Sequence, residues 1–243
     1  MNERPLRHED AEAVAAVVRA EQEAVCHRPS HIERRDVEMW WSRADLANDS
    51  WAVEENGDVV AAGWFSVHAG LGDITVTVAP AARGRDLEES FLERGEAIAR
   101  ERRIERVHTW VFPEDTEMSA RLVARGYREV RRFYEMAIEL EAEPAALAVP
   151  EPLVLEPARD EDARAFHAAT TEAFADHWEW HEVPFEEWWK LRQGQLEDAD
   201  GPLWFVVRDG DEIAAVIRNE MRENGGYVGI LGVRRPWRGR GLA

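Results

Sequence analysis

The sequence predicts an α/β protein with a mixed sheet, built as two copies of one unit in tandem. The chain has 243 residues, which is long for a single small domain. Hydrophobic residues make up 45% of it, enough to fill two modest cores. The pattern of helical and strand segments in the first half returns about 152 residues later, the signature of an internal repeat.

The repeat begins with a short acidic motif that opens a helix in each copy. Residues 7–13 (RHEDAEA) correspond to residues 159–165 (RDEDARA). Both motifs place carboxylates in the first helical turn, where the helix dipole favours them. Each copy continues to a pair of tryptophans, Trp40-Trp41 and Trp188-Trp189. We therefore expect two helices before the first long strand of each copy.

Three strands follow in each copy. Residues 50–58 (SWAVEENGD) and 203–211 (LWFVVRDGD) match each other and contain an Asn-Gly or Asp-Gly pair, which favours a tight hairpin. Apolar runs at 59–67 and 213–217 supply the second strand. The third strand ends in similar basic loops, whose sequences are VAPAARGR at 78–85 and VRRPWRGR at 233–240.

The first copy continues with further elements. Helices are predicted at about 86–103 and 116–125, a strand at 106–112 and a last strand at 131–140. The first domain is assigned to 1–140, a proline-containing linker to 141–152 and the second domain to 153–243. The second domain is expected to lack its C-terminal third, because nothing after its third strand corresponds to the remainder of the first copy.

Composition restricts the partners. The formal net charge is −19, so phosphate backbones of nucleic acids and anionic membrane surfaces are repelled, whereas a cationic amine is attracted. There is no apolar run long enough for a membrane span and no secretory signal pattern. The single cysteine, Cys26, fits a reducing compartment and is interpreted as an inert thiol. A cytoplasmic protein is expected.

The end of the second copy carries the most specific motif. Residues 229–233 (GILGV) have the pattern of a buried strand, and residues 238–243 (RGRGLA) follow it. Glycines allow consecutive backbone N–H groups to close around a pyrophosphate, and arginines attract its charge. The run resembles the R-x-x-G-x-A loop of the GNAT acetyltransferases, and the tandem arrangement is similar to that of two-domain acetyltransferases of the mycothiol synthase type, with weak support from residues 172–177 (EAFADH).

This resemblance implies a binding site for acetyl-CoA in the second copy. The loop would hold the pyrophosphate, while the backbone of the preceding strand would bind the pantetheine arm. The residues carried over from the family are Leu231, Val233, Arg238, Gly239, Arg240, Gly241, Leu242 and Ala243.

The corresponding loop of the first copy has lost these features. Asp86 replaces the second glycine and Glu88 the small residue, which puts carboxylates where a pyrophosphate would lie. The family's general acid is a tyrosine, but Leu122 stands at that position. The first copy is therefore expected to be a structural or substrate-shaping domain.

In the second copy the resemblance places a general base on the central strands. Glu220 is the candidate catalytic residue and Glu223 a second one, although a solvated carboxylate is the commoner role for either. Asp176, His177 and His181 lie among tryptophans that either line an acceptor pocket or pack the core. No third ligand accompanies the two histidines, so no metal site is expected.

The leading hypothesis is an N-acetyltransferase that transfers acetyl directly from acetyl-CoA to a small amine. The alternative is a non-catalytic acyl-CoA-binding or interaction module. The general acid would lie beyond Ala243, so the chain is expected to be a fragment or a truncated product. An unfinished sheet leaves an edge that a partner chain, as in a homodimer, could complete.

Overall fold

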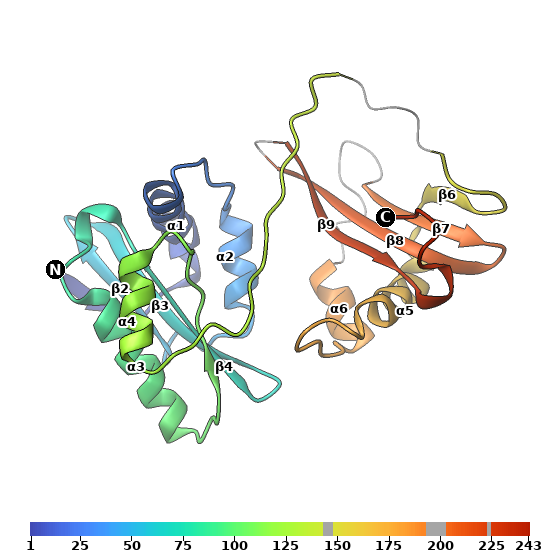
Figure 1. The fold of residues 1–243 in the computed structure, drawn as a ribbon. Coiled ribbons are helices and arrows are strands. Elements are labelled where there is room, and N and C mark those ends of the chain that lie inside the picture. Colours follow the sequence, from blue (N-terminus) through green and yellow to red (C-terminus); the bar gives the residue numbers. More distant parts are fainter. Residues whose placement is uncertain (143–147, 193–202, 223–224) are drawn as a thin grey trace. The chain divides into compact units, whose positions relative to one another are not determined.

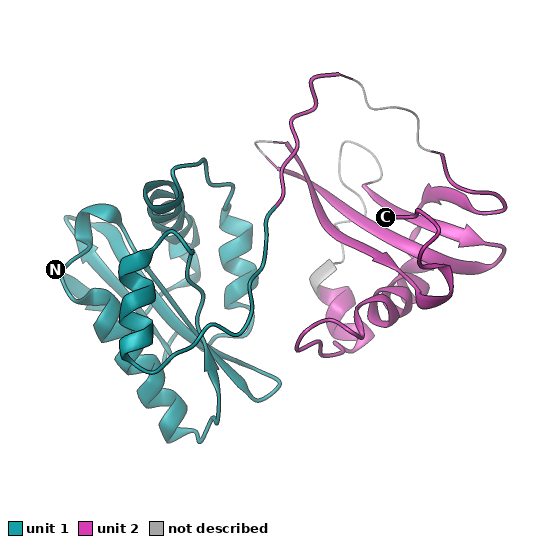
Figure 2. Ribbon diagram, in the orientation of Figure 1, with its two compact units in different colours: residues 1–135 teal, residues 136–243 magenta. Residues whose placement is uncertain are grey.

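The computed structural model describes residues 1–142, 148–192, 203–222 and 225–243. It divides into two compact units, Met1–Glu135 (unit 1) and Met136–Ala243 (unit 2), shown in Figure 2. In the described part of the chain, no helix combines the length and apolar character that crossing a membrane requires.

Unit 1 contains a five-stranded sheet in the order β1-β2-β3-β4-β5 (Figure 1). Neighbouring strands are antiparallel except β4 and β5, which are parallel, so the sheet is mixed as predicted. The strands are β1 (Asn2–Arg4), β2 (Ser50–Glu55), β3 (Asp58–His68), β4 (Leu71–Val78) and β5 (Val107–His108). The helices are α1 (Ala11–Cys26), α2 (Arg34–Trp41), α3 (Leu87–Glu101) and α4 (Thr116–Ala124).

Helices cover both faces of this sheet. Side chains alternate along a strand, so the neighbours Trp64 and Phe65 of β3 point to opposite faces. Trp64 belongs to a buried cluster with residues of α1 and α2, whereas Phe65 belongs to one with residues of α3 and α4. Both rings are at most 2% exposed, so the sheet is the middle of three layers.

Two predicted strands of the first copy differ from the structure. The strand expected at 106–112 is limited to β5, and residues 131–140 form no strand. The apolar side chains of this last segment are largely exposed, with Met136 at 90% and Ile138 at 81%. A strand needs a neighbour to satisfy its backbone groups, and no strand in the described part of the chain pairs with this segment.

Unit 2 contains a four-stranded antiparallel sheet in the order β6-β7-β8-β9. Helix α5 packs against β8 and β9, and α6 adds Trp188 to the same buried cluster. The packed-core interpretation is therefore confirmed for Trp188. The strands are β6 (Val154–Pro157), β7 (Trp204–Asp209), β8 (Glu212–Arg222) and β9 (Gly225–Val233), and the helices are α5 (Ala163–Phe174) and α6 (Phe185–Arg192).

The first hairpin has the same irregularity in both units. The register of β2 against β3 shifts between Val53 and Glu54, and that of β7 against β8 shifts between Val207 and Arg208. This correspondence corrects the sequence match by one residue. Trp204 begins β7 as Ser50 begins β2, so Trp204 is not the counterpart of Trp51.

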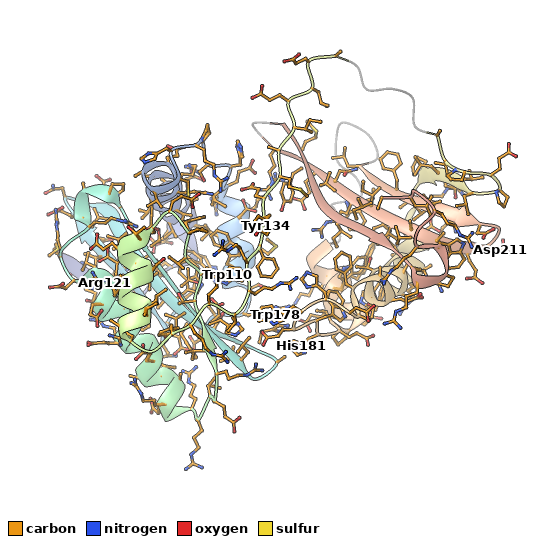
Figure 3. All side chains as sticks on the ribbon, viewed as in Figure 1. Trp110, Arg121, Tyr134, Trp178, His181 and Asp211 are labelled. Carbon is orange, nitrogen blue, oxygen red and sulfur yellow. The ribbon has the colours of Figure 1, made fainter. Side chains whose placement is uncertain are left out.

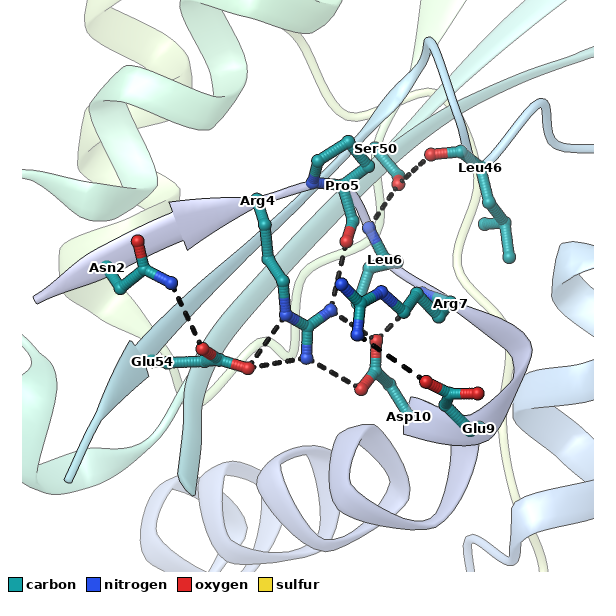
Figure 4. Close-up of polar contacts among 10 residues, drawn as sticks. All are labelled: Asn2, Arg4, Pro5, Leu6, Arg7, Glu9, Asp10, Leu46, Ser50 and Glu54. Atoms are coloured by element: carbon teal, nitrogen blue, oxygen red, sulfur yellow. Dashed lines mark hydrogen bonds and ion pairs between the residues drawn. The ribbon is translucent and has the colours of Figure 1, made fainter. Parts of the chain in front are cut away.

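An arginine clamp in unit 1 joins β1, β2 and the start of α1 (Figure 4). The Arg4 guanidinium donates to Asp10 at 2.7 and 2.8 Å and to Glu54 at 2.7 Å. Asp10 also accepts from the backbone N–H of Arg7. Burial opposes ionisation of Asp10, but the Arg4 and Arg7 bonds prevail and lower its pKa.

Unit 2 has a corresponding clamp in which the arginine and the glutamate have exchanged strands. Arg208 of β7 donates to Glu156 of β6 and to Asp162, both at 2.5 Å. Asp162 in turn accepts from the backbone N–H of Arg159, as Asp10 does from Arg7. The arginine has therefore moved from the first strand to the second, while the aspartate at the start of the helix is the same.

This exchange predicts the outcome of a charge-swap experiment. Arg4→Glu should lower the free energy of unfolding by about 1–3 kcal/mol, because Asp10 loses its partly buried partner and gains a negative charge beside it. Arg4→Glu combined with Glu54→Arg should recover more than half of that loss, because it reproduces the arrangement of unit 2. Urea unfolding curves measure both effects, and a double variant no more stable than Arg4→Glu would contradict the prediction.

Candidate functional site

The basic loop after β9 is anchored by a buried tryptophan. Trp237 ends a short 3₁₀ turn (Arg235–Trp237) and is 8% exposed. Its indole N–H donates to Asp209 Oδ2 at 2.8 Å, and the Arg234 guanidinium lies 4.9 Å from its ring centre. The loop therefore leaves the sheet at a fixed point.

Two glycines give this loop its conformation. Gly239 and Gly241 both have φ of 75°, a left-handed conformation, and a Cβ on either would meet nothing within 4 Å. In unit 1, Gly84 (φ 77°) and Asp86 (φ 58°) adopt corresponding conformations. The two loops thus have similar backbone conformations, but Asp86 carries a side chain where the loop of unit 2 has only Gly241.

The loop arginines converge on Asp176, which follows α5. Arg235 Nη2 lies 2.5 Å from its carboxylate and Arg238 Nη1 lies 3.4 Å from it. The Arg235 and Arg238 contacts lower the pKa of Asp176. This ionic contact was not foreseen from the sequence, where Asp176 was grouped with the nearby tryptophans.

Backbone N–H and C=O groups point outward from the edge of β9 that faces away from β8, on the side where the basic loop lies. The Arg234 N–H donates to the Ala214 carbonyl at 3.0 Å, which makes Ala215 and Val233 a non-hydrogen-bonded pair. The N–H and C=O of Val233 therefore point away from β8. Because the pattern alternates, those of Leu231 point the same way. Arg238 Nε already donates to the Val233 carbonyl at 3.1 Å.

In unit 1 a side chain blocks the corresponding edge. The same pattern directs the Val78 N–H outward, where Glu21 of α1 accepts from it at 3.4 Å. Glu21 also accepts from Thr77 Oγ1 at 2.7 Å and from Arg83 at 3.0 Å. Burial raises the pKa of Glu21, despite these three donors. A carboxylate of the chain thus fills the place that unit 2 leaves open.

Ala173 of α5 corresponds to Glu21, since α5 begins at Ala163 as α1 begins at Ala11. Its methyl group reaches no backbone donor, and it lies 3.0 Å from the point where a Cβ on Gly232 would be. A small residue at this position lets the helix approach the strand closely. The edges of β4 and β9 therefore differ at two neighbouring positions, since Glu21 and Thr77 in unit 1 stand where unit 2 has Ala173 and Gly232.

A β-bulge distinguishes β9 from β4. Arg218 pairs with Ile230 but Asn219 pairs with Val228, so Gly229 is the extra residue. The β3–β4 register of unit 1 has no such shift. Bulges are concentrated near active sites because they redirect neighbouring groups. The signal in the sequence, an isolated glycine inside a strand pattern, was overlooked.

Glu220 lies beside this bulge. Its Oε1 is 3.4 Å from the place of a Cβ on Gly229, and the side chain is 20% exposed. Its two oxygens lie 3.5 Å from Arg218 Nη2 and 3.7 Å from Arg222 Nη2. By the rise of a strand, Glu220 and the pairing partner of Val233 are roughly 15 Å apart along β8. Glu223 lies outside the described residues.

The remaining candidates lie in the segment after α5 and in unit 1. Trp178 and His181 lie between α5 and α6 (Figure 3). Among the described residues no cluster of three His, Cys, Asp or Glu side chains could hold a metal. Burial and the neighbouring Glu114 raise the pKa of Cys26, which disfavours its thiolate. Leu122 is buried in the unit 1 core.

The prediction of a buried strand at 229–233 is correct for the strand and wrong for burial. Gly232 is buried, but Leu231 is 43% exposed. In unit 1, α3 covers the matching face, where Val76 packs against Phe91 and its neighbours. No helix of the described chain covers this face of β9.

Comparison with known proteins gives matches in solved structures. No family model matches the chain, and neither does any curated protein. A GCN5-related N-acetyltransferase from Sphaerobacter thermophilus superposes with a TM-score of 0.79 and 26% identity, covering 99% of this chain and 78% of that one.

Two more distant structures share the fold. A tandem GNAT protein from the clavulanic acid biosynthesis pathway has a TM-score of 0.62 at 17% identity, covering 99% of this chain and 81% of that one. A GCN5-related glucosamine N-acetyltransferase region of a fungal multi-domain GH3 β-N-acetylglucosaminidase has a TM-score of 0.60 at 13% identity, covering 99% and 32%. The second of these spans many residues that this chain does not match.

The close approach of α5 to β9 predicts a steric effect. In Gly232→Val, the new Cβ would lie 3.0 Å from the Ala173 methyl and 3.2 Å from Phe174, so stability should fall by about 1–3 kcal/mol. Gly226→Val on the same strand meets nothing within 4 Å and is the control, with little expected change. Denaturant unfolding measures both, and equal effects would show that α5 does not pack as described.

Proposed function

Because the chain has the fold of the GNAT superfamily of N-acetyltransferases, we propose that it is an acetyl-CoA-dependent N-acetyltransferase. It consists of two GNAT-like domains in tandem, of which the second binds the coenzyme. The acceptor is a small amine, to which the strongly negative protein attracts the ammonium form. The protein acts in the cytoplasm and needs neither nucleic acid nor membrane.

One observation carries the choice of domain. The outward N–H groups of Leu231 and Val233 lead to a loop with two left-handed glycines, and the side chain beside Val233 is the cationic Arg238, which bonds to the Val233 carbonyl and not to its N–H. In unit 1, Glu21 occupies the edge and Asp86 occupies the second left-handed position. A phosphate-bearing ligand is therefore accommodated in unit 2 and repelled in unit 1.

The coenzyme would lie along the outer edge of β9. Backbone N–H groups of the loop cradle the pyrophosphate, and Arg238 and Arg240 add positive charge. The outward backbone groups of Leu231 and Val233 bind the amides of the pantetheine arm. Gly239, Gly241, Leu242 and Ala243 complete the proposed contacts. This path points the acyl end of the coenzyme along β9 toward the bulge at Gly229.

The reaction requires few groups from the protein. Glu220 accepts a proton from the ammonium of the acceptor, and the free amine attacks the thioester carbonyl. The carbon–sulfur bond then breaks to release the coenzyme as a thiolate, which takes up the second proton that the nitrogen loses on forming the amide. Both substrates are bound together, so the protein itself forms no acyl intermediate. Arg218 and Arg222 hold the Glu220 carboxylate in place at the bulge.

The alternative is a non-catalytic acyl-CoA-binding module. The ion pairs of Glu220 with Arg218 and Arg222 are consistent with this alternative, because a carboxylate between two guanidinium groups can also have a purely structural role. The two functions share the coenzyme site and differ only in turnover. Release of coenzyme thiol in the presence of a panel of small primary amines separates them.

The coenzyme site is tested by giving unit 2 the residue found in unit 1. Gly241→Asp should keep the backbone conformation, because Asp86 adopts it at φ 58°, but it places a carboxylate beside the pyrophosphate. Isothermal titration calorimetry should show acetyl-CoA binding weakened at least about tenfold. Gly84→Asp, at φ 77° in unit 1, is the matched control and should bind acetyl-CoA like the unmodified protein. The reverse pattern would move the coenzyme site to unit 1.

The general base is tested with Glu220→Gln. Turnover of a primary amine should fall by about 10²- to 10⁴-fold, while the dissociation constant of acetyl-CoA and the thermal midpoint stay unchanged. Asp211→Asn, which removes the same charge in the exposed β7–β8 turn, should leave turnover intact. Unchanged turnover in Glu220→Gln would exclude the assignment, and a lowered thermal midpoint with proportionate loss of activity would indicate a structural role.

A further inference from the structure

Unit 1 contains a small hollow that is open to solvent at its mouth. It lies where β4, the loop before α3 and the segment around α4 meet, and its lining includes Glu88 and Trp110. From its charge and walls we propose that this hollow binds a small organic ammonium ion. Such a site is separate from the coenzyme loop of unit 2 and does not depend on the function proposed for it.

Glu88 is the strongest evidence for a cationic ligand. It stands in the first turn of α3 and is 8% exposed. Its Oε2 is buried and has no hydrogen-bond partner among the described residues. Leaving a buried carboxylate oxygen unsatisfied is costly, and Glu88 lines the hollow, so a donor that a ligand brings to this oxygen would remove that cost.

The other charged residues of the lining form ion pairs. Arg83 is paired with Glu21 and Asp115, and Arg121 with Glu89 and Glu117. Four lining carboxylates face only two guanidinium groups, so the hollow carries excess negative charge, and Glu88 has no cation of its own. An ammonium group supplies the missing positive charge.

The walls suit the body of an organic amine. Trp110 is 60% exposed, and its indole N–H donates to Asp73 at 3.2 Å, which holds the ring in position (Figure 3). Phe112 and Met118 also line the hollow. Aromatic faces attract cations and cover apolar groups, so an amine with a flat or aliphatic body fits better than a bare inorganic cation.

The same residues exclude a phosphate ligand from the hollow. The N-terminus of a helix attracts anions, and α3 begins beside it. In this chain, Asp86 at the N-terminus of α3 and Glu88 in its first turn already supply negative charge there. The site therefore prefers the opposite charge to the one bound at the corresponding place in unit 2.

The test uses benzylamine with the full chain and no acetyl-CoA. Calorimetry should detect binding, and hydrogen–deuterium exchange should show protection within residues 107–121. Benzyl alcohol, which has the same shape without the charge, should bind at least about tenfold more weakly. Equal binding of the two compounds, protection confined to residues outside 107–121 or no binding of benzylamine would overturn the proposal.

Three variants locate the interaction. Glu88→Gln should weaken benzylamine at least about tenfold, because it removes the charge that the ammonium contacts. Glu93→Gln, on the same helix with its side chain 65% exposed, is the matched control and should bind like the unmodified protein. Trp110→Ala changes an exposed side chain and should also weaken binding, which tests the site if Glu88→Gln folds poorly. Unaltered affinity in both Glu88→Gln and Trp110→Ala would refute the assignment.

Discussion

The outward-facing backbone groups at the end of the last long strand, β4 in unit 1 and β9 in unit 2, are the constraint on which the chemistry of both units depends. Such groups need a hydrogen-bond partner from the chain, from water or from a ligand. Unit 1 meets the need with the carboxylate of Glu21, which bonds to the Val78 N–H. Unit 2 has Ala173 at that position, and Arg238 bonds to the Val233 carbonyl at its edge. The outward groups thus meet a carboxylate at the Val78 N–H in unit 1 and a guanidinium at the Val233 carbonyl in unit 2.

The loops after these strands also keep one backbone conformation while their side chains differ. Their backbone paths agree, with left-handed residues at Gly84 and Asp86 in unit 1 and at Gly239 and Gly241 in unit 2. Aspartate tolerates this conformation better than most residues with a side chain, so the exchange of Gly for Asp preserves the path. It changes the electrostatics completely. One backbone path thus carries two carboxylates in unit 1 (Asp86 and Glu88) and glycine in unit 2 (Gly241).

The charge-exchanged clamp shows how far side chains change while the fold stays the same. Arg4 with Glu54 and Arg208 with Glu156 join the same two strands in opposite polarity, and an aspartate at the start of the helix completes each clamp. Coulomb attraction depends on the product of the charges, so either polarity serves. What persists is the requirement that the first strand, second strand and helix start be tied together.

The sequence by itself determined the mixed sheet of unit 1, most helix positions and the left-handed glycines of the loop around Gly241, because periodicity, turn residues and glycine-rich motifs are local properties. It failed for residues 131–140 and for the burial of Leu231, since a strand or a buried face depends on a neighbour that the local pattern does not reveal. Only the tertiary structure brought Glu21 to Val78 and placed Glu220 at the Gly229 bulge. These contacts join residues distant in sequence, and their geometry depends on how a helix packs on a sheet and where one strand gains an extra residue.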